Sequence, residues 1–477
     1  MRNYINKWIV SAVLASLMTT IAAASKRPNV VIILADDQGY GDLGCFGSQT
    51  IKTPVIDGLA AEGMKFTQFY VTASVCTPSR ASLMTGSYPA RVGFSKGVVF
   101  PDHEHGLPAG IKTLPDLFKE VGYTTGMVGK WHLGHSEGNL PLDRGFDYFY
   151  GAPYSNDMVM SSHLKVSSNM VLRNGRTKED FLEKRWGAEN RGVLMQGDEV
   201  IEFPADQTLW TQRFTEKAVD FIKANSEQPF FLYVAHCMPH LPIELSERFA
   251  GKSAHGPYGD TIQEIDWSTG EILKALRDTG VDQNTLLVYT SDNGPWIYAG
   301  SPEEVGTAGP LRDGKSYQWE GGMRMPTVMW GPGIVASGKV CDEMASTLDL
   351  YTTFAKLIGA TLPSDRELDG YDISALWSGD ADVKSPRDSM LYFSLMGELV
   401  GIRKGDWKLL LHSDRMVEQY MKKAEKHKFT HLDNVELFNL QQDVSEKYNL
   451  ADENPEKVKT LRDELQRYRY LDIKNLN

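Results

Sequence analysis

A set of polar residues in this chain stands at or just after the ends of four short apolar segments. The segments are 29–35, 124–129, 230–235 and 285–290, and the residues that follow them are Asp36 and Asp37, Lys130 and His132, His236 and His240, and Asp292 and Asn293. Carboxylates, imidazoles and an ammonium group together could bind a cation, hold an anion and move protons. Because open α/β sheets bind ligands at the carboxyl ends of their strands, these residues are predicted to form one site.

The acidic members of this set predict a site for a hard divalent cation. Asp36 with Asp37, and Asp292 with Asn293, offer only oxygen ligands, which Ca²⁺ and Mg²⁺ prefer. Zinc fits less well, because too few histidine or thiolate ligands accompany these oxygens. Either pair in isolation would more often be a solvated turn or a helix cap. Their shared position at strand ends is what favours a metal site.

Cys76 stands in a stretch that is suited to binding an anion, "SVCTPSRASLMTG" at 74–86. Thr77 and Pro78 can begin a helix predicted over 79–84, so that free backbone N–H groups and the positive end of the helix dipole lie beside residue 76. Arg80 would hold an anion there through forked hydrogen bonds. From these residues alone Cys76 can be a small buried hydrophobe, which is the commonest role of a free cysteine, a metal ligand, a nucleophile, or the precursor of a more reactive group.

A largely parallel sheet is needed to bring these strand ends together, and the pattern along the chain predicts one. Strand-like apolar segments alternate with amphipathic segments through the first three quarters of the chain. The strand-like segments are the four named above, 29–35, 124–129, 230–235 and 285–290, and the helix-like segments are 53–63, 113–122, 218–226 and 271–280. The predicted fold is α/β, with a large mixed, mostly parallel sheet sandwiched by helices.

From residue 381 onward the predicted elements become short strands separated by turn residues. The segments 389–395, 399–411 and 435–440 predict a small antiparallel sheet. The tail over 455–470 carries apolar residues at helical spacing, with Asn454 as its cap. The chain is therefore predicted to consist of a catalytic domain at 25–380 and a C-terminal subdomain at 381–477, which holds the small sheet and a terminal helix.

Residues 1–24 are predicted to be a signal peptide. Arg2 and Lys7 precede an apolar stretch at 8–21 and small residues follow it, so cleavage is expected near Ala24. This stretch is shorter than the roughly 20 residues that span a bilayer, and no later segment is apolar enough to do so. We expect a secreted or periplasmic protein without a stable membrane span.

The net charge limits the kinds of binding partner, and the cysteine content limits the number of disulfides. The formal net charge of −12 argues against nucleic acid, which requires an excess of Lys and Arg on one face. Attraction for an anionic substrate must therefore be local. The four cysteines, Cys45, Cys76, Cys237 and Cys341, are too few for a disulfide scaffold, although the sequence leaves one bridge open.

Motifs along almost the whole chain resemble those of the formylglycine-dependent type I sulfatases, the arylsulfatase family of the alkaline phosphatase superfamily. "CTPSRASLMTG" matches the first signature of that family, C-x-P-S-R-x-x-x-[LM]-T-G, and "GYTTGMVGKWHLG" matches the second. Further matches, in the expected order, are "ADDQGYGDLGCFG", "GAPYSND", "FFLYVAHCMPHLP", "TSDNG", "GPLRDGKSYQWEGGMRMP" and "IRKGDWKLL". Several look most like the branch of arylsulfatase A and N-acetylgalactosamine-6-sulfatase. The resemblance implies an alkaline phosphatase-like fold and sulfatase activity.

The resemblance also implies which residues perform the chemistry. In this family a formylglycine-generating enzyme or an anaerobic sulfatase-maturating enzyme oxidises the signature cysteine to formylglycine, so Cys76 is expected to be a precursor. The implied Ca²⁺ ligands are Asp36, Asp37, residue 76, Asp292 and Asn293, and the implied catalytic residues are Cys76, Arg80, Lys130, His132, His240 and Lys315. The implied substrate-binding residues are Ser155, Lys130, His240 and Lys315.

In the implied mechanism, positively charged groups stabilise the sulfate monoester as it reacts. One hydroxyl of the hydrated aldehyde attacks sulfur while His240, assisted by Lys315, protonates the departing alcohol. The second hydroxyl then loses a proton to His132, which releases sulfate and restores the aldehyde. Outside this set, His236 is either a partner of His240 or a structural histidine. Asn156 and Asp157 either face the sugar or form a turn.

Three functions are weighed for this chain. The leading hypothesis is a sulfatase acting on sulfated galactose or N-acetylgalactosamine in an algal polysaccharide or a glycosaminoglycan. The second is a phosphomonoester or phosphonate-ester hydrolase on the same scaffold, which the single oxygen cluster disfavours because phosphate dianions demand more positive charge. The third is a non-catalytic protein that binds sulfated glycans, which requires that Cys76 stays unmodified.

Overall fold

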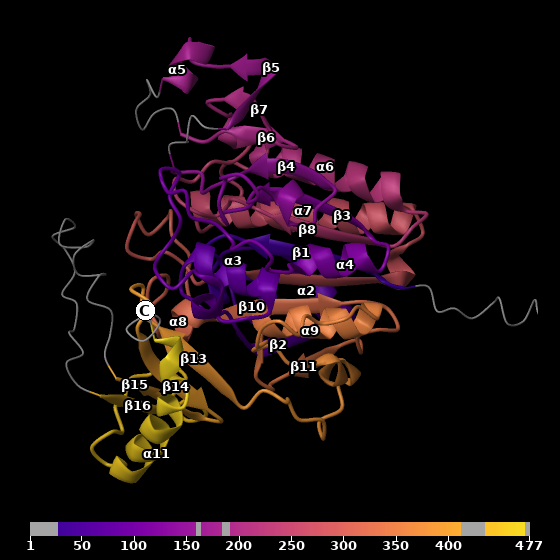
Figure 1. Ribbon diagram of the computed structural model, residues 1–477. Helices are drawn as coiled ribbons and strands as arrows, with labels where there is room; N and C mark the ends of the chain where they lie inside the picture. Colours follow the sequence, from indigo (N-terminus) through magenta and orange to yellow (C-terminus); the bar gives the residue numbers. More distant parts are fainter. Residues whose placement is uncertain (1–26, 159–163, 184–190, 412–434, 473–477) are drawn as a thin grey trace, which may run out of the picture.

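A twelve-stranded mixed sheet runs through the middle of the protein (Figure 1). Its strands are β1 (Asn29–Ala35), β2 (Met64–Tyr70), β3 (Thr124–Lys130), β4 (Tyr148–Ala152), β5 (Lys165–Leu172), β6 (Leu194–Gln196), β7 (Glu199–Phe203), β8 (Phe230–Ala235), β9 (Thr285–Ser291), β10 (Arg324–Trp330), β11 (Lys339–Cys341) and β12 (Ala345–Ser346). Their order is β11-β2-β10-β9-β1-β8-β3-β4-β6-β7-β5, with β12 paired to β2. The five central strands from β9 to β4 are all parallel, which confirms the predicted mostly parallel sheet.

The computed structural model describes residues 27–158, 164–183, 191–411 and 435–472. The signal peptide predicted at 1–24 lies outside the described residues. Among the helices in the described part of the chain, none is long and apolar enough to cross a membrane.

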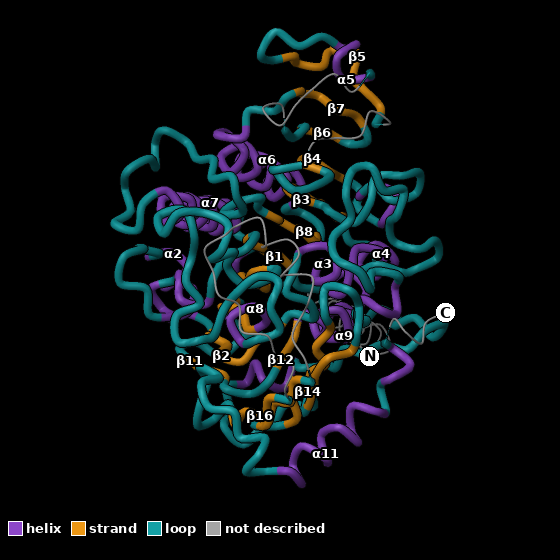
Figure 2. Tube along the Cα trace, turned by 90° about the vertical axis from the view of Figure 1, so that its left-hand side faces the viewer, coloured by secondary structure: helices purple, strands orange, loops and turns teal. Residues whose placement is uncertain are grey.

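Helices cover both faces of the large sheet. They are α2 (Pro54–Glu62), α3 (Cys76–Thr85), α4 (Leu114–Glu120), α5 (Lys178–Leu182), α6 (Trp210–Asn225), α7 (Pro257–Asp278), α8 (Glu320–Met323) and α9 (Thr347–Ile358). In Figure 2 the strands run down the middle, with α2 and α7 on the left and α3, α4 and α9 on the right. Each face has its own hydrophobic core, and this explains why β1 is apolar at every position from Val30 to Ala35.

A second sheet of four antiparallel strands follows the large one in the chain, as predicted. It consists of β13 (Ser389–Phe393), β14 (Leu399–Lys404), β15 (Trp407–Leu410) and β16 (Glu436–Asn439), in that order. Helix α11 (Pro455–Gln466) packs Leu461 and Leu465 against this sheet. Asn454 is the N-cap residue of α11, but its side chain donates to the carbonyl of Leu450 at 3.0 Å and does not cap the helix. The domain boundary between 380 and 381 stays a prediction.

Candidate active site

Four neighbouring parallel strands end at the same edge of the large sheet and bring most of the predicted polar residues together. β9, β1, β8 and β3 are adjacent, with Ala35 level with Ser291 and Leu34 level with Ala235. The side chains that this edge collects are Asp36, Asp37, Lys130, His132, His240, Asp292 and Asn293. All of them are buried. Asp37 and His132 adopt left-handed backbone conformations, with φ of 65° for each, which is a form of strain that proteins tend to store at functional sites.

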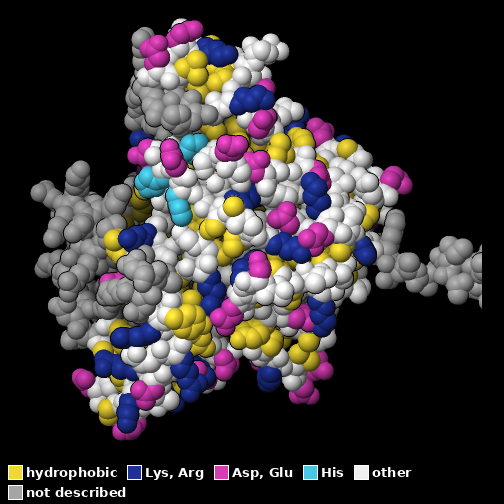
Figure 3. Space-filling view, in the orientation of Figure 1, with side chains coloured by type: hydrophobic (Ala, Val, Ile, Leu, Met, Phe, Trp, Pro, Cys, Tyr) yellow, Lys and Arg dark blue, Asp and Glu magenta, His cyan; other side chains and the backbone are white. Residues whose placement is uncertain are grey.

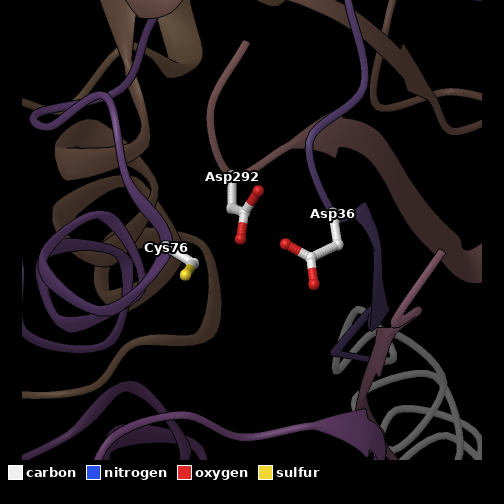
Figure 4. A group of neighbouring side chains, drawn as sticks. All are labelled: Asp36, Cys76 and Asp292. Carbon is white, nitrogen blue, oxygen red and sulfur yellow. The ribbon is translucent and has the colours of Figure 1, made fainter. Parts of the chain in front are cut away.

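Cys76 reaches the same space from helix α3. The helix begins at Cys76, three residues earlier than predicted, because the extended Val75 is its N-cap. One ligand atom each of Asp36, Cys76 and Asp292 lie within 4.8 Å of one another. Figure 4 shows the three side chains pointing into a common space from three different segments. The thiol therefore lies at the positive end of a ten-residue helix and beside two carboxylates.

Three buried ion pairs surround this space. Arg80 Nη2 lies 2.8 Å from Asp292 Oδ2, Lys130 Nζ lies 2.6 Å from Asp36 Oδ2, and Lys315 Nζ lies 2.7 Å from Asp37 Oδ2. Burial raises the pKa of Asp37, but the nearby charges, chiefly that of Lys315, outweigh it and lower that pKa. Burial and the neighbouring Asp36 raise the pKa of Asp292 to about 6. The cations of this cluster are groups that can hold an anion, and its carboxylates are groups that can hold a metal ion.

Two oxygen atoms in the cluster have no hydrogen-bond partner, although both are fully buried. They are Asp36 Oδ1 and Asn293 Oδ1, while the Asn293 amide nitrogen donates to Asp37 Oδ1 at 2.7 Å. A buried acceptor without a partner is costly unless an ion or a water satisfies it. Oxygen donors in this number suit a hard cation such as Ca²⁺, so the residues present fit the metal that the motifs imply.

His132 is placed to accept a proton. Its Nε2 lies 3.0 Å from the carbonyl oxygen of Val99, so Nε2 carries a hydrogen and donates it. Its Nδ1 is buried without a partner. Burial and the charge of Lys130 hold the pKa of His132 well below its usual value, so the ring is neutral with a lone pair at Nδ1.

His240 is oriented by Asn156, a residue that the sequence left between a sugar contact and a turn. The Asn156 amide nitrogen donates to the carbonyl of Pro242 at 2.9 Å, which turns its Oδ1 toward His240 Nδ1 at 3.0 Å. The hydrogen of the imidazole is therefore on Nδ1. His240 Nε2 faces Asp37 Oδ2 at 3.6 Å. Burial and the charge of Lys315 lower the pKa of His240 to about 4.

Lys315 approaches from the loop between β9 and α8, and the same loop region supplies a residue that the sequence did not single out. Lys315 Nζ lies 4.4 Å from the centre of the Trp296 ring, and the His240 ring lies 5.5 Å from it. Trp296 is partly exposed, so one part of the ring holds the two side chains and another is open to solvent. The signal available in the sequence was an aromatic residue three positions after Asn293.

Ser155 joins the cluster, and His236 does not. Ser155 Oγ accepts a hydrogen bond from Lys130 Nζ at 3.1 Å. His236 Nε2 lies 3.3 Å from Ser268 Oγ in α7, on the other side of the sheet edge, as a structural histidine would. All four cysteines lie in the described part of the chain and are free thiols, so the bridge that the sequence left open does not form.

Charge outside the cluster is mixed. On the face shown in Figure 3, acidic and basic side chains are interspersed. The net charge of −12 is therefore no obstacle to an anion that meets the buried cations of the cluster.

Comparisons with known proteins agree with this geometry. The family model described as Sulfatase matches residues 28–360. N-acetylgalactosamine-6-sulfatase of Rattus norvegicus is 39% identical over 374 residues, which cover 76% of this chain and 68% of that protein. Arylsulfatase A of Homo sapiens is 37% identical over 472 residues, which cover 94% of this chain and 89% of that protein. The crystal structure of Ps i-CgsB in complex with k-i-k-neocarrahexaose has a TM-score of 0.77 at 28% identity and covers 94% of each chain.

Proposed function

We propose that this chain, which belongs to the sulfatase family and hydrolyses sulfate esters, acts on sulfated galactose or N-acetylgalactosamine residues of a polysaccharide or glycosaminoglycan. Membership of the family confirms the resemblance seen in the motifs and the leading hypothesis of a sulfuric ester hydrolase. Among the observations of the structure, the one that carries the chemistry is the meeting of Cys76 with Asp36 and Asp292 amid three buried cations.

Cys76 serves in this proposal as the precursor of formylglycine. Burial raises the pKa of the thiol, so Cys76 is not a thiolate and would be a weak nucleophile itself. A formylglycine-generating enzyme or an anaerobic sulfatase-maturating enzyme would oxidise it before or during folding, because the folded chain leaves it 2% exposed. Once formed, the hydrated aldehyde supplies the nucleophilic oxygen.

Asp36, Asp37, Asp292 and Asn293, together with residue 76, would hold Ca²⁺. The unpartnered oxygens of Asp36 and Asn293 support this assignment. The cation supplies positive charge beside the oxygens of the bound sulfate ester. The chain's own cations do the same: Arg80 and Lys130 line one side of residue 76, and Lys315 lies beside Asp37.

His240 and Lys315 form a pair that would protonate the departing alcohol. Both face Asp37 Oδ2, at 3.6 and 2.7 Å, so an oxygen atom in front of them meets the Lys315 ammonium group and His240 Nε2. Because Nε2 carries no hydrogen at rest, Lys315 would be the source of the proton and His240 would relay it through Nε2. Burial lowers the pKa of Lys315, but the neighbouring carboxylates, chiefly Asp37, outweigh it and raise that pKa, so Lys315 holds its protons. His132, neutral with a free Nδ1, would take the proton that leaves residue 76 in the second half of the reaction. Ser155 keeps Lys130 in place for the sulfate.

The proposed sugar rests on the relatives and is tested with a panel of defined substrates. Sulfated galactose, N-acetylgalactosamine and N-acetylglucosamine saccharides, 4-nitrophenyl sulfate and 4-nitrophenyl phosphate are each incubated with matured enzyme. We expect kcat/KM for a galactose or N-acetylgalactosamine sulfate to exceed that for the glucosamine epimer by about 100-fold, since a misplaced hydroxyl leaves buried polar groups unpaired. A preference for glucosamine contradicts the proposed sugar. A dominant rate with the phosphate contradicts the sulfatase assignment itself.

A polar cavity beside His240 supports a substrate that extends beyond one sugar. Its volume is about 430 Å³, and Arg173, Arg191, Asp206, Gln207, Pro242 and Glu244 are among the residues that line it. Gln207 donates to the carbonyl of Asn156 at 2.8 Å, and Asn156 holds His240. The cavity therefore lies on the side where the alcohol would depart. Arginine, amide and carboxylate side chains are the groups that bind sugar hydroxyls and sulfates.

Replacing Arg191 with alanine is expected to weaken binding of oligosaccharides and to spare small substrates. Arg191 lines the cavity and is partly exposed, which places its guanidinium within reach of a substrate there. One charged hydrogen bond lost to the second sugar raises KM for a sulfated oligosaccharide by about tenfold. The KM for 4-nitrophenyl sulfate stays unchanged, because that substrate does not reach the cavity. Arg277→Ala, on the surface of α7, is the matched control, and equal effects on both substrates contradict the role of the cavity.

We also propose that the chain is exported and then cleaved near Ala24, and that residues 25–380 and 381–477 are its catalytic domain and C-terminal subdomain. The composition of residues 1–24 supports the first statement, and the separate four-stranded sheet supports the second. Amino-terminal sequencing of the secreted or periplasmic protein tests the cleavage, and a mature chain that begins well before Ala24 contradicts it.

A further inference from the structure

We propose that the C-terminal subdomain positions Lys315 through a buried cluster of three charged residues, Glu320, Lys408 and Glu446, which we call the junction cluster. Lys408 belongs to the motif "IRKGDWKLL", to which the proposed chemistry gives no role. The inference deepens the proposed function, because it rests on the part that Lys315 plays there. Lys408 and Glu446 would be positioning residues, since they act on the substrate only through Lys315.

The junction cluster joins the small sheet to the first residue of helix α8. Lys408, in β15, has no exposed surface, and its Nζ lies 3.0 Å from Glu320 Oε1 and 2.7 Å from Glu446 Oε1. Glu446, which follows β16, accepts a hydrogen bond from the backbone nitrogen of Glu320 at 2.7 Å through its other oxygen. Figure 1 shows α8 at the junction of the two sheets, beside β13. The C-terminal subdomain thus holds both the side chain and the backbone of Glu320.

The large sheet holds Glu320 from the other side. Tyr70 in β2 donates its hydroxyl to Glu320 Oε2, and Arg324 Nη1 lies 3.5 Å from the same oxygen. Burial raises the pKa of Glu320, but the charges of Lys408 and two arginines outweigh it and lower the pKa to about 2. Burial raises the pKa of Glu446 to about 7. Glu320 is therefore a fixed anion between two sheets, and its position depends on Lys408.

Helix α8 in turn fixes the loop that carries Lys315. Gly321 N donates to the carbonyl of Arg312 at 2.8 Å. A Cβ at Gly321 would lie 2.1 Å from the carbonyl oxygen of Asp313, and one at Gly322 would lie 2.5 Å from that of Gly314. The two backbones touch without room for a side chain, so a displacement of α8 displaces residues 312–317 with it.

The same helix touches the loop that carries Asn293. Gly294 N donates to the carbonyl of Gly322 at 3.2 Å, and a Cβ at Gly294 would lie 1.8 Å from the carbonyl oxygen of Gly321. Lys315 N donates to the carbonyl of Pro295 at 2.9 Å. A rigid chain of backbone contacts therefore leads from the junction cluster through α8 to Lys315 Nζ, which must stay 2.7 Å from Asp37. An error of about 1 Å in such a group can cost roughly 100-fold in rate.

Replacing Lys408 with methionine is expected to slow poor leaving groups more than good ones. Methionine fills the volume of the lysine stem but removes the cation nearest to Glu320, at 3.0 Å, and leaves it only the more distant Arg324 and Arg403. A sugar alcohol needs a proton as it departs, whereas 4-nitrophenolate departs readily without one. We expect kcat/KM to fall by about 100-fold for the sulfated saccharide and by less than about tenfold for 4-nitrophenyl sulfate. Glu446→Gln, which keeps the shape of the side chain, is expected to give a smaller loss with the same asymmetry.

Lys404→Met is the matched control. Lys404 lies on β14 of the same small sheet, but its partner is Glu464 of α11 at 2.7 Å, away from α8. The Lys404→Met variant should leave kcat/KM for both substrates close to that of the parent enzyme. Circular dichroism and thermal melting verify that each variant is folded at the assay temperature, and a Glu446→Gln protein serves if Lys408→Met does not fold.

A double variant separates positioning from a general structural effect. If the junction cluster acts through Lys315, Lys408→Met adds no further loss in a Lys315→Ala background, measured with the sulfated saccharide, which is the substrate that Lys408→Met alone slows most. Additive losses, or equal losses for the two substrates in Lys408→Met, overturn the inference. Lys315→Ala alone tests the proposed function and not the junction cluster. If that variant slows both substrates equally, the proposed role of Lys315 in protonating the leaving alcohol is contradicted.

Discussion

Replacing Cys76 with alanine is expected to lower kcat/KM for every sulfate ester by about 10⁵-fold or more, which is the scale of loss when a covalent nucleophile is deleted. Alanine has no sulfur to oxidise, so no aldehyde can form at residue 76. The loss arises in kcat, because the buried cations Arg80, Lys130 and Lys315 remain and still bind the sulfate group. Steady-state kinetics with 4-nitrophenyl sulfate measures it.

The control for this variant is a second buried cysteine. Cys341 is 8% exposed and lies in β11, the strand at one edge of the large sheet, so Cys341→Ser should keep nearly full activity. In the parent protein, mass spectrometry of the peptide that bears Cys76 should show a mass about 18 Da below that of the thiol, the difference between cysteine and formylglycine. Full activity in protein whose Cys76 peptide shows only the thiol mass contradicts the precursor role.

The sequence predicted the parts of the site that periodic patterns determine. β1 is buried from Asn29 to Ala35 and ends where Asp36 begins, and its parallel partners β8 and β9 end at the same level. Buried strands show as unbroken apolar segments, and in an α/β fold their polar successors must share an edge. The order of strands along the sheet did not follow from the pattern. β8 and β9 flank β1 although about 200 and about 250 residues, respectively, separate them from it, and hydrophobic periodicity carries no information about such pairings.

Contacts between loops could not be predicted in this way. Asn156 and His240 are 84 residues apart, and Glu320 and Glu446 are 126 apart. Nothing periodic connects such pairs, and each depends on the course of two irregular segments. Trp296 was missed for the same reason. The start of α3 was placed three residues late because Pro78 reads as a first-turn residue, whereas the extended Val75 lets the helix begin at Cys76.

Removal of the divalent cation is expected to abolish activity and to lower the stability of the fold. A chelator such as EGTA would leave the oxygens of Asp36 and Asn293 unsatisfied again. At a free Ca²⁺ concentration about 100 times Kd, bound metal stabilises the native state by about 2.7 kcal/mol, so the melting temperature should fall on chelation and recover with Ca²⁺. Activity that survives exhaustive chelation, with metal content verified to be below one tenth of an equivalent, contradicts the calcium assignment.

The best variant for testing the ligands is Asn293→Ala, because the three carboxylates cannot be changed without breaking an ion pair. Asp292→Asn, for instance, removes the carboxylate closest to the buried Arg80 guanidinium, at 2.8 Å, and breaking such a buried ion pair typically costs about 3–5 kcal/mol of stability whatever the metal does. Asn293 is neutral, so its removal should raise Kd for Ca²⁺ by about 10- to 100-fold and leave activity recoverable at high Ca²⁺. Asn29→Ala removes a buried asparagine at the opposite end of the neighbouring strand β1 and should change stability but not Ca²⁺ affinity. Equal Ca²⁺ affinity in the Asn293 and Asn29 variants contradicts the ligand assignment.

The charges of the site predict that metal binding and anion binding are coupled. Asp36, Asp37 and Asp292 are balanced by Arg80, Lys130 and Lys315 before any metal binds. A divalent cation therefore leaves the site with an excess of two positive charges, which an anionic sulfate ester or the sulfate product reduces. Binding of the metal and binding of the anion should each strengthen the other by the same factor, because coupling between two sites is reciprocal. Titration of Ca²⁺ with and without saturating sulfate measures that factor, and a factor of one would mean that the metal and the anion do not share this pocket.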